Sequence, residues 1–418
     1  MSFVGLVDCN SFYCSCETVF RPDTRNRPVI VLSNNDGCAI AFNRKAKDIG
    51  FGQMCEPYFM IKDRIKKHNV AVFSSNYTLY DNMSKRVMEI LRGFTANLEV
   101  YSIDEAFMDM DGYDYFDLME YGKKIRGEIL KQTGLPVGVG ISKTKVLSKL
   151  ANRLAKKNAG VLVLKDDKDI DEALKVFPVR DIWGVGSRSA MKLNMLGIRT
   201  AYDFKYYRQD NIIQKLLTKT GRQVQEELRG VNCLEMEHAE DKKNTGTTRS
   251  FGCQVFTKHD LREALAEFAT HAAEKLRRQE GVCFSLTAFV HTNPSKDVPQ
   301  YYGSGHFNFV SGTSDTLKII KGAHKVLDDI YRVGFEYKKG GVILNHIVPR
   351  SENQLNLFDT DTEDNEHLSS VVDLINKRYG SYTIKSAACG VHQKWRTIAD
   401  FKSQRYTTSW NEILKIKA

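Results

Sequence analysis

The chain has 418 residues, of which 42% are hydrophobic, and a formal net charge of +10 at pH 7. No stretch approaches the ~18 consecutive apolar residues that a membrane span needs, and no basic leader precedes the first apolar run, so we expect a globular cytoplasmic protein that does not contact membranes. The positive charge favours polyanionic partners, and the nine cysteines match neither a zinc-site spacing nor a small disulfide framework, which favours reduced thiols.

Residues 1 to about 170 alternate between strand and helix patterns, which predicts an α/β or α+β domain. The expected strands are residues 3–9, 27–34, 99–110 and 135–142, and the expected helices are residues 81–94 and 122–134.

Three acids stand at the ends or in the middle of these apolar runs. Asp8 ends the first run, and Asp104 and Glu105 lie side by side within residues 99–110. Adjacent side chains of a regular strand point to opposite faces, so this pair converges only at a bend. The apolar residues on both sides predict two short strands of a hairpin with the acids at or near its turn.

If the strand of Asp8 is a neighbour of this hairpin, three carboxylates meet. Clustered carboxylates repel one another unless a cation lies between them, and oxygen-only ligands favour a hard ion such as Mg²⁺. Two such ions about 3.5–4 Å apart form the two-metal arrangement for phosphoryl transfer. The alternative is that these residues are separate surface acids at strand ends.

The stretch 142–157 is strongly basic and contains no acid. Leu147, Leu150 and Leu154 recur at helical spacing, which predicts a helix with one packed face and basic residues on the others. Its lysines are candidates for phosphate contact, although a solvated helix face explains them equally well.

Residues 171 to about 240 have helical patterns with short loops. Within them Gly184-Val185-Gly186 lies between helical segments, the pattern of a helix-hairpin-helix whose backbone N–H groups hold a DNA phosphate. A plain helical turn is the alternative.

The polar stretch 241–248 is the best linker candidate, and an α+β domain follows it to about residue 350. Residues 351–418 begin with an acidic run and look like an appended tail with short helices. The peptide QLNLFD, residues 354–359, is able to order on binding and to place its Leu and Phe side chains in a partner's groove.

In combination these motifs resemble the Y-family DNA polymerases, and within them the UmuC type, the catalytic subunit of bacterial DNA polymerase V, which includes MucB-, RumB- and ImpB-like proteins. The resemblance covers nearly the whole chain and rests on these stretches, quoted in chain order: DCNSFYCSCE, VIVLSNNDGC, FSSNYTLYDNMS, YSIDEAF, VGVGISKTKVLSKLAN, DIWGVG, TRSFG, QLNLFD and RYTTS.

The resemblance implies an α+β multidomain fold of the right-hand polymerase kind. Its parts are a ferredoxin-like palm (1–12 and 78–170), small fingers (13–77), a helical thumb with the helix-hairpin-helix (171–240), the linker (241–248), an α+β little-finger domain (249–350) and the C-terminal tail (351–418).

The resemblance also assigns roles to individual residues. The implied ligands of two Mg²⁺ ions are Asp8, the backbone carbonyl of Cys9, Asp104 and Glu105. Tyr13 matches the steric gate, the aromatic residue that excludes a sugar 2′-hydroxyl; an ordinary core aromatic is the alternative.

Further assignments concern phosphates, DNA and the sliding clamp. Triphosphate binding is implied for Lys156, and for Lys47 and Arg44, which stand where many relatives have Arg and Tyr, respectively. The candidate DNA contacts are Gly184, Gly186, Lys143, Lys145, Lys149 and Arg249. The candidate clamp-binding residues are Gln354, Leu355, Leu357 and Phe358.

The implied function is error-prone translesion DNA synthesis in the SOS response to DNA damage, by transfer of a nucleotide from a dNTP to a primer 3′-hydroxyl on template DNA. The implied partners are primer-template DNA, the β sliding clamp, a UmuD-type dimer and a RecA-type recombinase filament, with a nucleoid-associated location. Two alternatives stay open, a stand-alone polymerase of the polymerase IV type and a non-catalytic DNA-binding scaffold.

Overall fold

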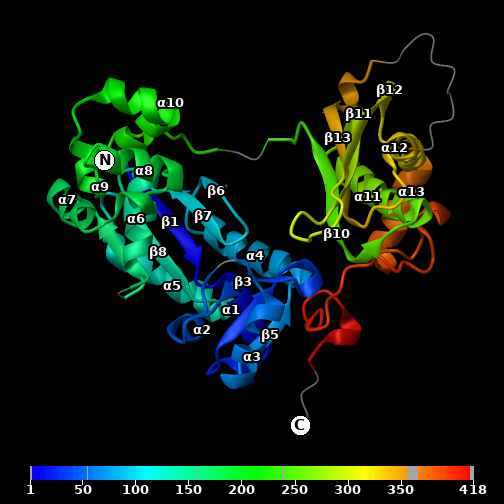
Figure 1. The fold of residues 1–418 in the computed structure, drawn as a ribbon. Coiled ribbons are helices and arrows are strands. Elements are labelled where there is room, and N and C mark those ends of the chain that lie inside the picture. Colours follow the sequence, from blue (N-terminus) through cyan, green and yellow to red (C-terminus); the bar gives the residue numbers. More distant parts are fainter. Residues whose placement is uncertain (1, 54, 158, 238–239, 355–365, 415–418) are drawn as a thin grey trace. The chain divides into compact units, whose positions relative to one another are not determined.

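The computed structural model of the chain describes residues 2–53, 55–157, 159–237, 240–354 and 366–414 (Figure 1). The chain forms two compact units: Met1–Ser33, Gly37–Ala239 and Phe401–Ala418 make up the first, and Asn34–Asp36 with Glu240–Asp400 the second. In the described ranges, no helix is long and apolar enough to cross a membrane. All nine cysteines are unpaired thiols.

The core of the first unit is a five-stranded sheet with the order β6-β7-β1-β8-β9. Its strands are β1 (Val4–Cys9), β6 (Leu98–Val100), β7 (Glu105–Asp109), β8 (Val137–Ser142) and β9 (Val161–Leu164). β1 is central because its residues are almost all apolar and buried, and it pairs antiparallel with both β7 and β8. The helices α5 (Leu118–Thr133) and α6 (Lys145–Ala155) pack on this sheet, and α4 (Tyr77–Arg92) packs beside α5.

A smaller sheet of order β4-β3-β2-β5 lies within the predicted fingers. Its elements are β2 (Val29–Leu32), β3 (Cys38–Phe42), β4 (Glu56–Pro57) and β5 (Ala71–Ser74), with α2 (Arg44–Asp48), α3 (Tyr58–Lys67) and the 3-10 turn η1 (Pro22–Thr24). The 3-10 turn η2 (Asn34–Asp36), which lies between β2 and β3 in the sequence, belongs to the second unit. Ile30, Leu32 and Ile61 are fully buried in its core. The helix α1 (Phe12–Phe20) connects β1 to this region.

Helices dominate residues 167–228, as the sequence predicts. They are α7 (Asp167–Lys175), η3 (Val179–Asp181), α8 (Ser187–Met195), α9 (Ala201–Tyr206) and α10 (Asp210–Leu228). Gly184 adopts a φ of +89°, and a Cβ there would lie 2.7 Å from the side chain of Val224. The turn before α8 therefore requires glycine at this position.

The second unit is a four-stranded antiparallel sheet of order β10-β13-β11-β12 packed against two helices. Its elements are β10 (Thr245–Val255), α11 (Lys258–Arg278), β11 (Gly281–Thr292), β12 (Tyr302–Thr313), α12 (Thr316–Ile330), β13 (Tyr337–Pro349) and η4 (Arg350–Glu352). The predicted linker 241–248 differs from the structure in its second half, because β10 begins at Thr245 and pairs there with Leu344.

The predicted tail divides between the two units. The helix α13 (Glu366–Tyr379) and the turn η5 (Ala387–Cys389) belong to the second unit, where Arg277 forms an ion pair of 2.7 Å with Asp373. Residues from Phe401 onward, including η6 (Trp410–Glu412), belong to the first unit. Figure 1 shows this last described segment in red beside β5. The tail is therefore integrated into the fold, which an appended segment would not be.

Candidate active site

The three predicted acids are brought together by the register of the central sheet. Asp8 on β1 lies opposite Glu105 on β7, and the Cys9 N–H donates to the Asp104 carbonyl over 2.8 Å. β6 and β7 form an antiparallel hairpin in which Val100 pairs with Ala106. Asp104 lies in the turn of that hairpin and Glu105 begins its second strand, so the expected bend is present.

Each acid has a polar partner. Lys156 Nζ lies 2.6 Å from Asp8 Oδ1, and Lys149 Nζ lies 2.8 Å from Glu105 Oε1. The Ser102 hydroxyl donates to Asp104 Oδ1 over 2.6 Å. Two ammonium groups therefore supply the positive charge that closely spaced carboxylates need.

Burial raises the pKa of the Asp8 carboxyl above its usual range, the ion pair with Lys156 opposes this rise, and the charges of Asp104 and Glu105 reinforce it. The Asp8 carboxylate thus lies in the electrostatic field of both other acids. We call Asp8, Asp104 and Glu105 the acid corner.

The donor chemistry of the acid corner suits a hard divalent cation, since it offers carboxylate oxygens and the strand backbone and no soft ligand. The side chains themselves are turned to their lysine and serine partners. Among the residues that the structure describes, no group of three or more His, Cys, Asp and Glu is gathered closely enough to hold a metal ion. For a metal ion to bind at the acid corner, the ammonium groups of Lys156 and Lys149 thus have to move away from the carboxylates of Asp8 and Glu105.

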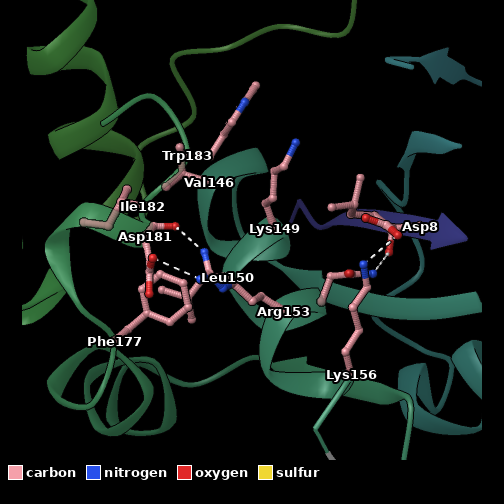
Figure 2. A pocket seen from close by; sticks show the side chains of 12 residues that line it. Asp8, Val146, Lys149, Leu150, Arg153, Lys156, Phe177, Asp181, Ile182 and Trp183 are labelled. Atoms are coloured by element: carbon pink, nitrogen blue, oxygen red, sulfur yellow. Dashed lines mark hydrogen bonds and ion pairs between the residues drawn. The ribbon is translucent and has the colours of Figure 1, made fainter. Parts of the chain in front are cut away.

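A pocket of about 290 Å³ opens between α6 and the loop before α8, and Asp8 lines its edge (Figure 2). Figure 2 shows the ion pair of Lys156 with Asp8 on one side of the pocket and the ion pair of Arg153 with Asp181 on the other. Lys149 lies over the rings of Tyr101 and Trp183, at 4.5 Å and 5.0 Å from their centroids. The pocket is therefore lined by cations on α6 and reaches one of the three acids.

Tyr13 lies in the first turn of α1 and is half-buried. Its ring stacks on Tyr80 of α4, with centroids 4.6 Å apart and planes at 19°, and meets Tyr77 edge-on. Burial raises the pKa of the Tyr13 phenol, and the charges of Tyr77 and Asp104 add to the rise. The candidate steric gate is thus held by aromatic neighbours within electrostatic reach of the acid corner.

Glu17, one turn after Tyr13 on α1, is fully buried and accepts a hydrogen bond from the Tyr80 hydroxyl over 2.7 Å. Burial raises the pKa of Glu17 to about 7, and the Tyr80 hydroxyl, Ser403 and Arg21 oppose the rise. Between pH 4.5 and about 7, the Glu17 carboxyl is therefore protonated in the folded chain and ionised in the unfolded chain.

We expect Glu17→Gln to change the pH dependence of stability. The contribution of Glu17 is complete below pH 4.5 and is lost as the pH rises through about 7. The variant should match the wild type at pH 4 and exceed its free energy of unfolding by about 3 kcal/mol at pH 8. Urea unfolding at both pH values measures this difference, and an equal difference at the two values would contradict the assignment.

The candidate fingers cations lie on the short helix α2. Arg44 is exposed and forms an ion pair of 2.8 Å with Asp48. Lys47 is exposed, and its charge counteracts the rise in the pKa of Cys14, the residue after Tyr13. The Lys47 charge therefore acts on Cys14 of α1, whereas the Arg44 guanidinium is paired with Asp48.

The candidate DNA contacts fall into separate environments. Gly184 and Gly186 form the turn before α8, and Gly186 is its N-cap residue. Lys143 is partly exposed and pairs with Asp167, and Arg249 lies half-buried on β10 in the second unit. Lys149 belongs to the acid corner through its ion pair with Glu105.

Lys145 is buried, and this argues against the expected DNA contact. Its side chain is 3% exposed, and its ammonium group forms an ion pair with Glu99 and donates to the Glu235 carbonyl over 2.6 Å. The Glu237 N–H donates to the same Glu99 carboxylate. Lys145 therefore fixes the segment after α10 to the central sheet.

We expect Lys145→Ala to lower the free energy of unfolding by about 3 kcal/mol, because it leaves the Glu99 charge buried without its partner. Lys143→Ala is the matched control, since the Lys143–Asp167 pair is largely exposed on the Asp167 side and should contribute less than about 1 kcal/mol. Urea unfolding measures both. Equal losses in the two variants would refute a structural role for Lys145.

The clamp-binding prediction is only partly within the described residues. Gln354 is exposed at the end of the segment that follows η4. Leu355, Leu357 and Phe358 lie outside the described residues.

Sequence reasoning missed several residues that build this site. Ser102 holds Asp104, and Tyr80 supports Tyr13 from another helix. A sequence signal existed for Tyr80, since Tyr77 and Tyr80 recur at the three-residue spacing of one helix face. No comparable pattern marks Ser102, because its role depends on the hairpin turn.

Family models match most of the chain. A model described as the impB/mucB/samB family matches residues 7–153, and the C-terminal domain of that family matches residues 242–357. The IMS family HHH motif matches residues 167–198, and a domain of unknown function matches residues 366–416.

Curated relatives match the chain from end to end. Protein UmuC of Salmonella typhimurium is 43% identical over 99% of this chain and 100% of its own length. Protein MucB of Escherichia coli is 38% identical over 98% of each chain. DNA polymerase IV 1 of Bacillus subtilis is 25% identical over 97% of this chain and 95% of its own.

Solved structures share the fold. A Y-family DNA polymerase chimera, Dbh-Dpo4(243-245)-Dbh, is similar at a TM-score of 0.66 and 21% identity, covering 83% of this chain and 99% of that chain. An insertion ternary complex of Dbh DNA polymerase is similar at a TM-score of 0.56, with the same identity and coverage.

Proposed function

The chain belongs to the impB/mucB/samB family, and on this premise we propose that it is a DNA-directed DNA polymerase that performs error-prone translesion synthesis in the SOS response. The observation that carries the proposal is the acid corner, in which Asp8 lies opposite Glu105 and Asp104 occupies the hairpin turn between β6 and β7. The 43% identity to protein UmuC, compared with 25% to DNA polymerase IV 1, favours the UmuC type over a stand-alone polymerase IV type.

The reaction joins the primer 3′-oxygen to the α-phosphorus of a dNTP, releases pyrophosphate and frees the hydroxyl proton. Asp8, Asp104, Glu105 and the Cys9 carbonyl would hold divalent cations, with Mg²⁺ as the proposed ion. When bound, two such ions activate the attacking oxygen and stabilise the leaving oxygen.

The residues of the chain itself bind and orient the substrates in this proposal. Lys156, which pairs with Asp8 in the structure, would offer its ammonium group to the triphosphate, and Lys47 would offer a second cation from the fingers. Arg44 is a weaker candidate because Asp48 already neutralises it. Tyr13 closes the space beside the sugar.

The proposed DNA grip uses phosphates and not bases. The backbone at Gly184 and Gly186, the ammonium group of Lys143 and the guanidinium of Arg249 would contact phosphates, so DNA binding should weaken steeply with salt. Lys149 would act at the acid corner, and Lys145 has no part in this grip.

The proposed protein partners are the β sliding clamp, through Gln354, Leu355, Leu357 and Phe358, together with a UmuD-type dimer and a RecA-type recombinase filament. Clamp binding would raise the local concentration of the polymerase at the primer end and offset its weak hold on DNA. The match of residues 366–416 to a domain of unknown function does not assign contacts to these partners.

Primer extension on a template with an abasic site tests the proposed function. The purified full-length chain is assayed alone, with a UmuD-type dimer, and with the dimer and a recombinase filament. We expect synthesis past the abasic site only when the partners are present. Full bypass by the chain alone would support a stand-alone polymerase, and no incorporation on any template would indicate a non-catalytic scaffold.

A further inference from the structure

The candidate steric gate does not stand alone in the fold. One side of the Tyr13 ring is covered by Tyr80, whose ring is fully buried, and Tyr77 closes the arrangement edge-on. The buried Tyr80 ring therefore restricts the orientations that Tyr13 can adopt on the side that faces α4.

Tyr80 is itself tied to α1. Its hydroxyl donates to Glu17 Oε1 over 2.7 Å, and both side chains are 0% exposed. Tyr13 and Glu17 are one helical turn apart on α1, so Tyr80 contacts the same helix at two successive turns. This double contact fixes α4 against α1 at the gate.

The C-terminal tail binds next to this arrangement, at the end of β5. The Phe401 N–H donates to the Ser74 hydroxyl over 2.9 Å, and the Ser74 N–H donates back to the Phe401 carbonyl over 3.0 Å. These bonds anchor the tail to the end of β5, three residues before α4 begins.

Asn76 connects the tail to the start of α4. Its Oδ1 accepts the Leu79 N–H as the cap of α4, and its Nδ2 donates to the Ser403 hydroxyl over 3.0 Å and to the Gln404 carbonyl over 3.2 Å. The Asn76 side chain is fully buried. The first turn of α4, which carries Tyr77 and Tyr80, is thus held by residues of the tail.

Tyr406 is the apolar anchor of the tail. It is 9% exposed, and its ring stacks on Phe20, the last residue of α1, with centroids 4.8 Å apart and planes at 9°. The tail therefore spans from the start of α4 to the end of α1, the two helices whose contact holds Tyr13.

We propose that residues 401–406 of the C-terminal tail position the Tyr13 ring through Asn76, Glu17 and Tyr80, and thereby set how strongly the active site rejects ribonucleotides. This inference rests on the proposed function, because it deepens the role of Tyr13 as a steric gate. Tyr80 and Tyr406 act as positioning residues, since Tyr80 contacts Tyr13 and Tyr406 contacts Phe20 of the same helix.

The first test changes the hydrogen bond beneath the gate. Tyr80→Phe keeps the stacked ring and removes the hydroxyl that Glu17 accepts. Single-nucleotide incorporation opposite template dG gives kcat/KM for dCTP and for CTP, and the ratio of the two should fall about three- to tenfold. Tyr121→Phe is the matched control. It removes the partly buried hydrogen bond from the Tyr121 hydroxyl to the Phe94 carbonyl in the same unit, and it should leave the ratio unchanged.

The second test changes the tail. Tyr406→Ala removes the ring that stacks on Phe20 and should lower the ratio of dCTP to CTP by a similar three- to tenfold. Trp410→Ala is its control, since Trp410 belongs to the same tail but is 90% exposed. Thermal unfolding of all four variants reports whether each is folded at the assay temperature.

The outcomes separate the inference from the proposed function. If Tyr13→Ala lowers the ratio while Tyr80→Phe and Tyr406→Ala reduce incorporation of dCTP and CTP by the same factor, both residues are merely structural and the inference is overturned. If Tyr13→Ala leaves the ratio unchanged, the steric gate itself is wrong. A ratio lowered in Tyr80→Phe and Tyr406→Ala, and not in the two controls, supports the inference.

Discussion

Asp104→Ala should incorporate a templated dNTP at least about 10³-fold more slowly than the wild type, while its affinity for primer-template DNA stays the same. Asp104 lies in the hairpin turn, where its carboxylate faces Ser102 and reaches the environment of Asp8 and Tyr13. Removing it takes one carboxylate from the acid corner without disturbing β1 or β7. Pre-steady-state incorporation measures the rate, and fluorescence anisotropy measures DNA binding.

Asp109→Ala provides the control for this experiment. Asp109 ends the same strand β7, pairs with Val4 and accepts the Asp111 N–H at its Oδ1, far along the strand from Glu105. Its variant should retain incorporation within a few-fold. If both variants lose activity equally, strand stability and not the acid corner explains the loss; if Asp104→Ala keeps full activity, the metal-site assignment is wrong.

Tyr13→Ala should lower the preference for dNTP over rNTP at least about 10²-fold, because the space beside the sugar is then large enough for a 2′-hydroxyl. The decrease in kcat/KM for dCTP should be much smaller than the increase in kcat/KM for CTP. The measurement is the ratio of kcat/KM for the two nucleotides opposite template dG.

Tyr13→Phe separates the ring from the hydroxyl. The phenylalanine ring keeps the stacking on Tyr80, so this variant should retain most of the preference. Loss of the preference in Tyr13→Phe would mean that the hydroxyl, and not the shape of the ring, excludes the ribose. Unchanged preference in Tyr13→Ala would place the gate elsewhere.

The acid corner could be predicted from sequence because local rules are strong there. Asp8 is a polar residue at the end of a buried run, which predicts the end of a strand, and the acid pair inside another apolar run predicts a bend. The register of β1 and β7 brings Asp8 opposite Glu105. The hairpin was predictable for the same reason, since apolar residues stand on both sides of the acids, and Val100 and Ala106 pair across it. The reaction itself came only from the family resemblance.

Side-chain partners depend on contacts between distant elements, and here sequence reasoning failed or was silent. Lys145 and Lys149 are equivalent in a basic stretch, yet one is buried against Glu99 and the other pairs with Glu105. The boundary of the linker was missed because the polar residues before Arg249 pair as an edge strand with β13. No local sequence pattern predicts that the tail joins the first unit from Phe401 onward. This placement depends on hydrogen bonds to Ser74 and Asn76, which lie more than 300 residues earlier in the chain.

Counting bound divalent cations tests the central claim most directly, that the acid corner holds the ions for nucleotidyl transfer. Mn²⁺ binding is measured by electron paramagnetic resonance in the presence of primer-template DNA and a non-hydrolysable dNTP analogue, for the wild type, Asp104→Ala and Asp109→Ala. We predict tight Mn²⁺ binding in the wild type and Asp109→Ala and its loss in Asp104→Ala. Equal Mn²⁺ binding by all three proteins would contradict the claim.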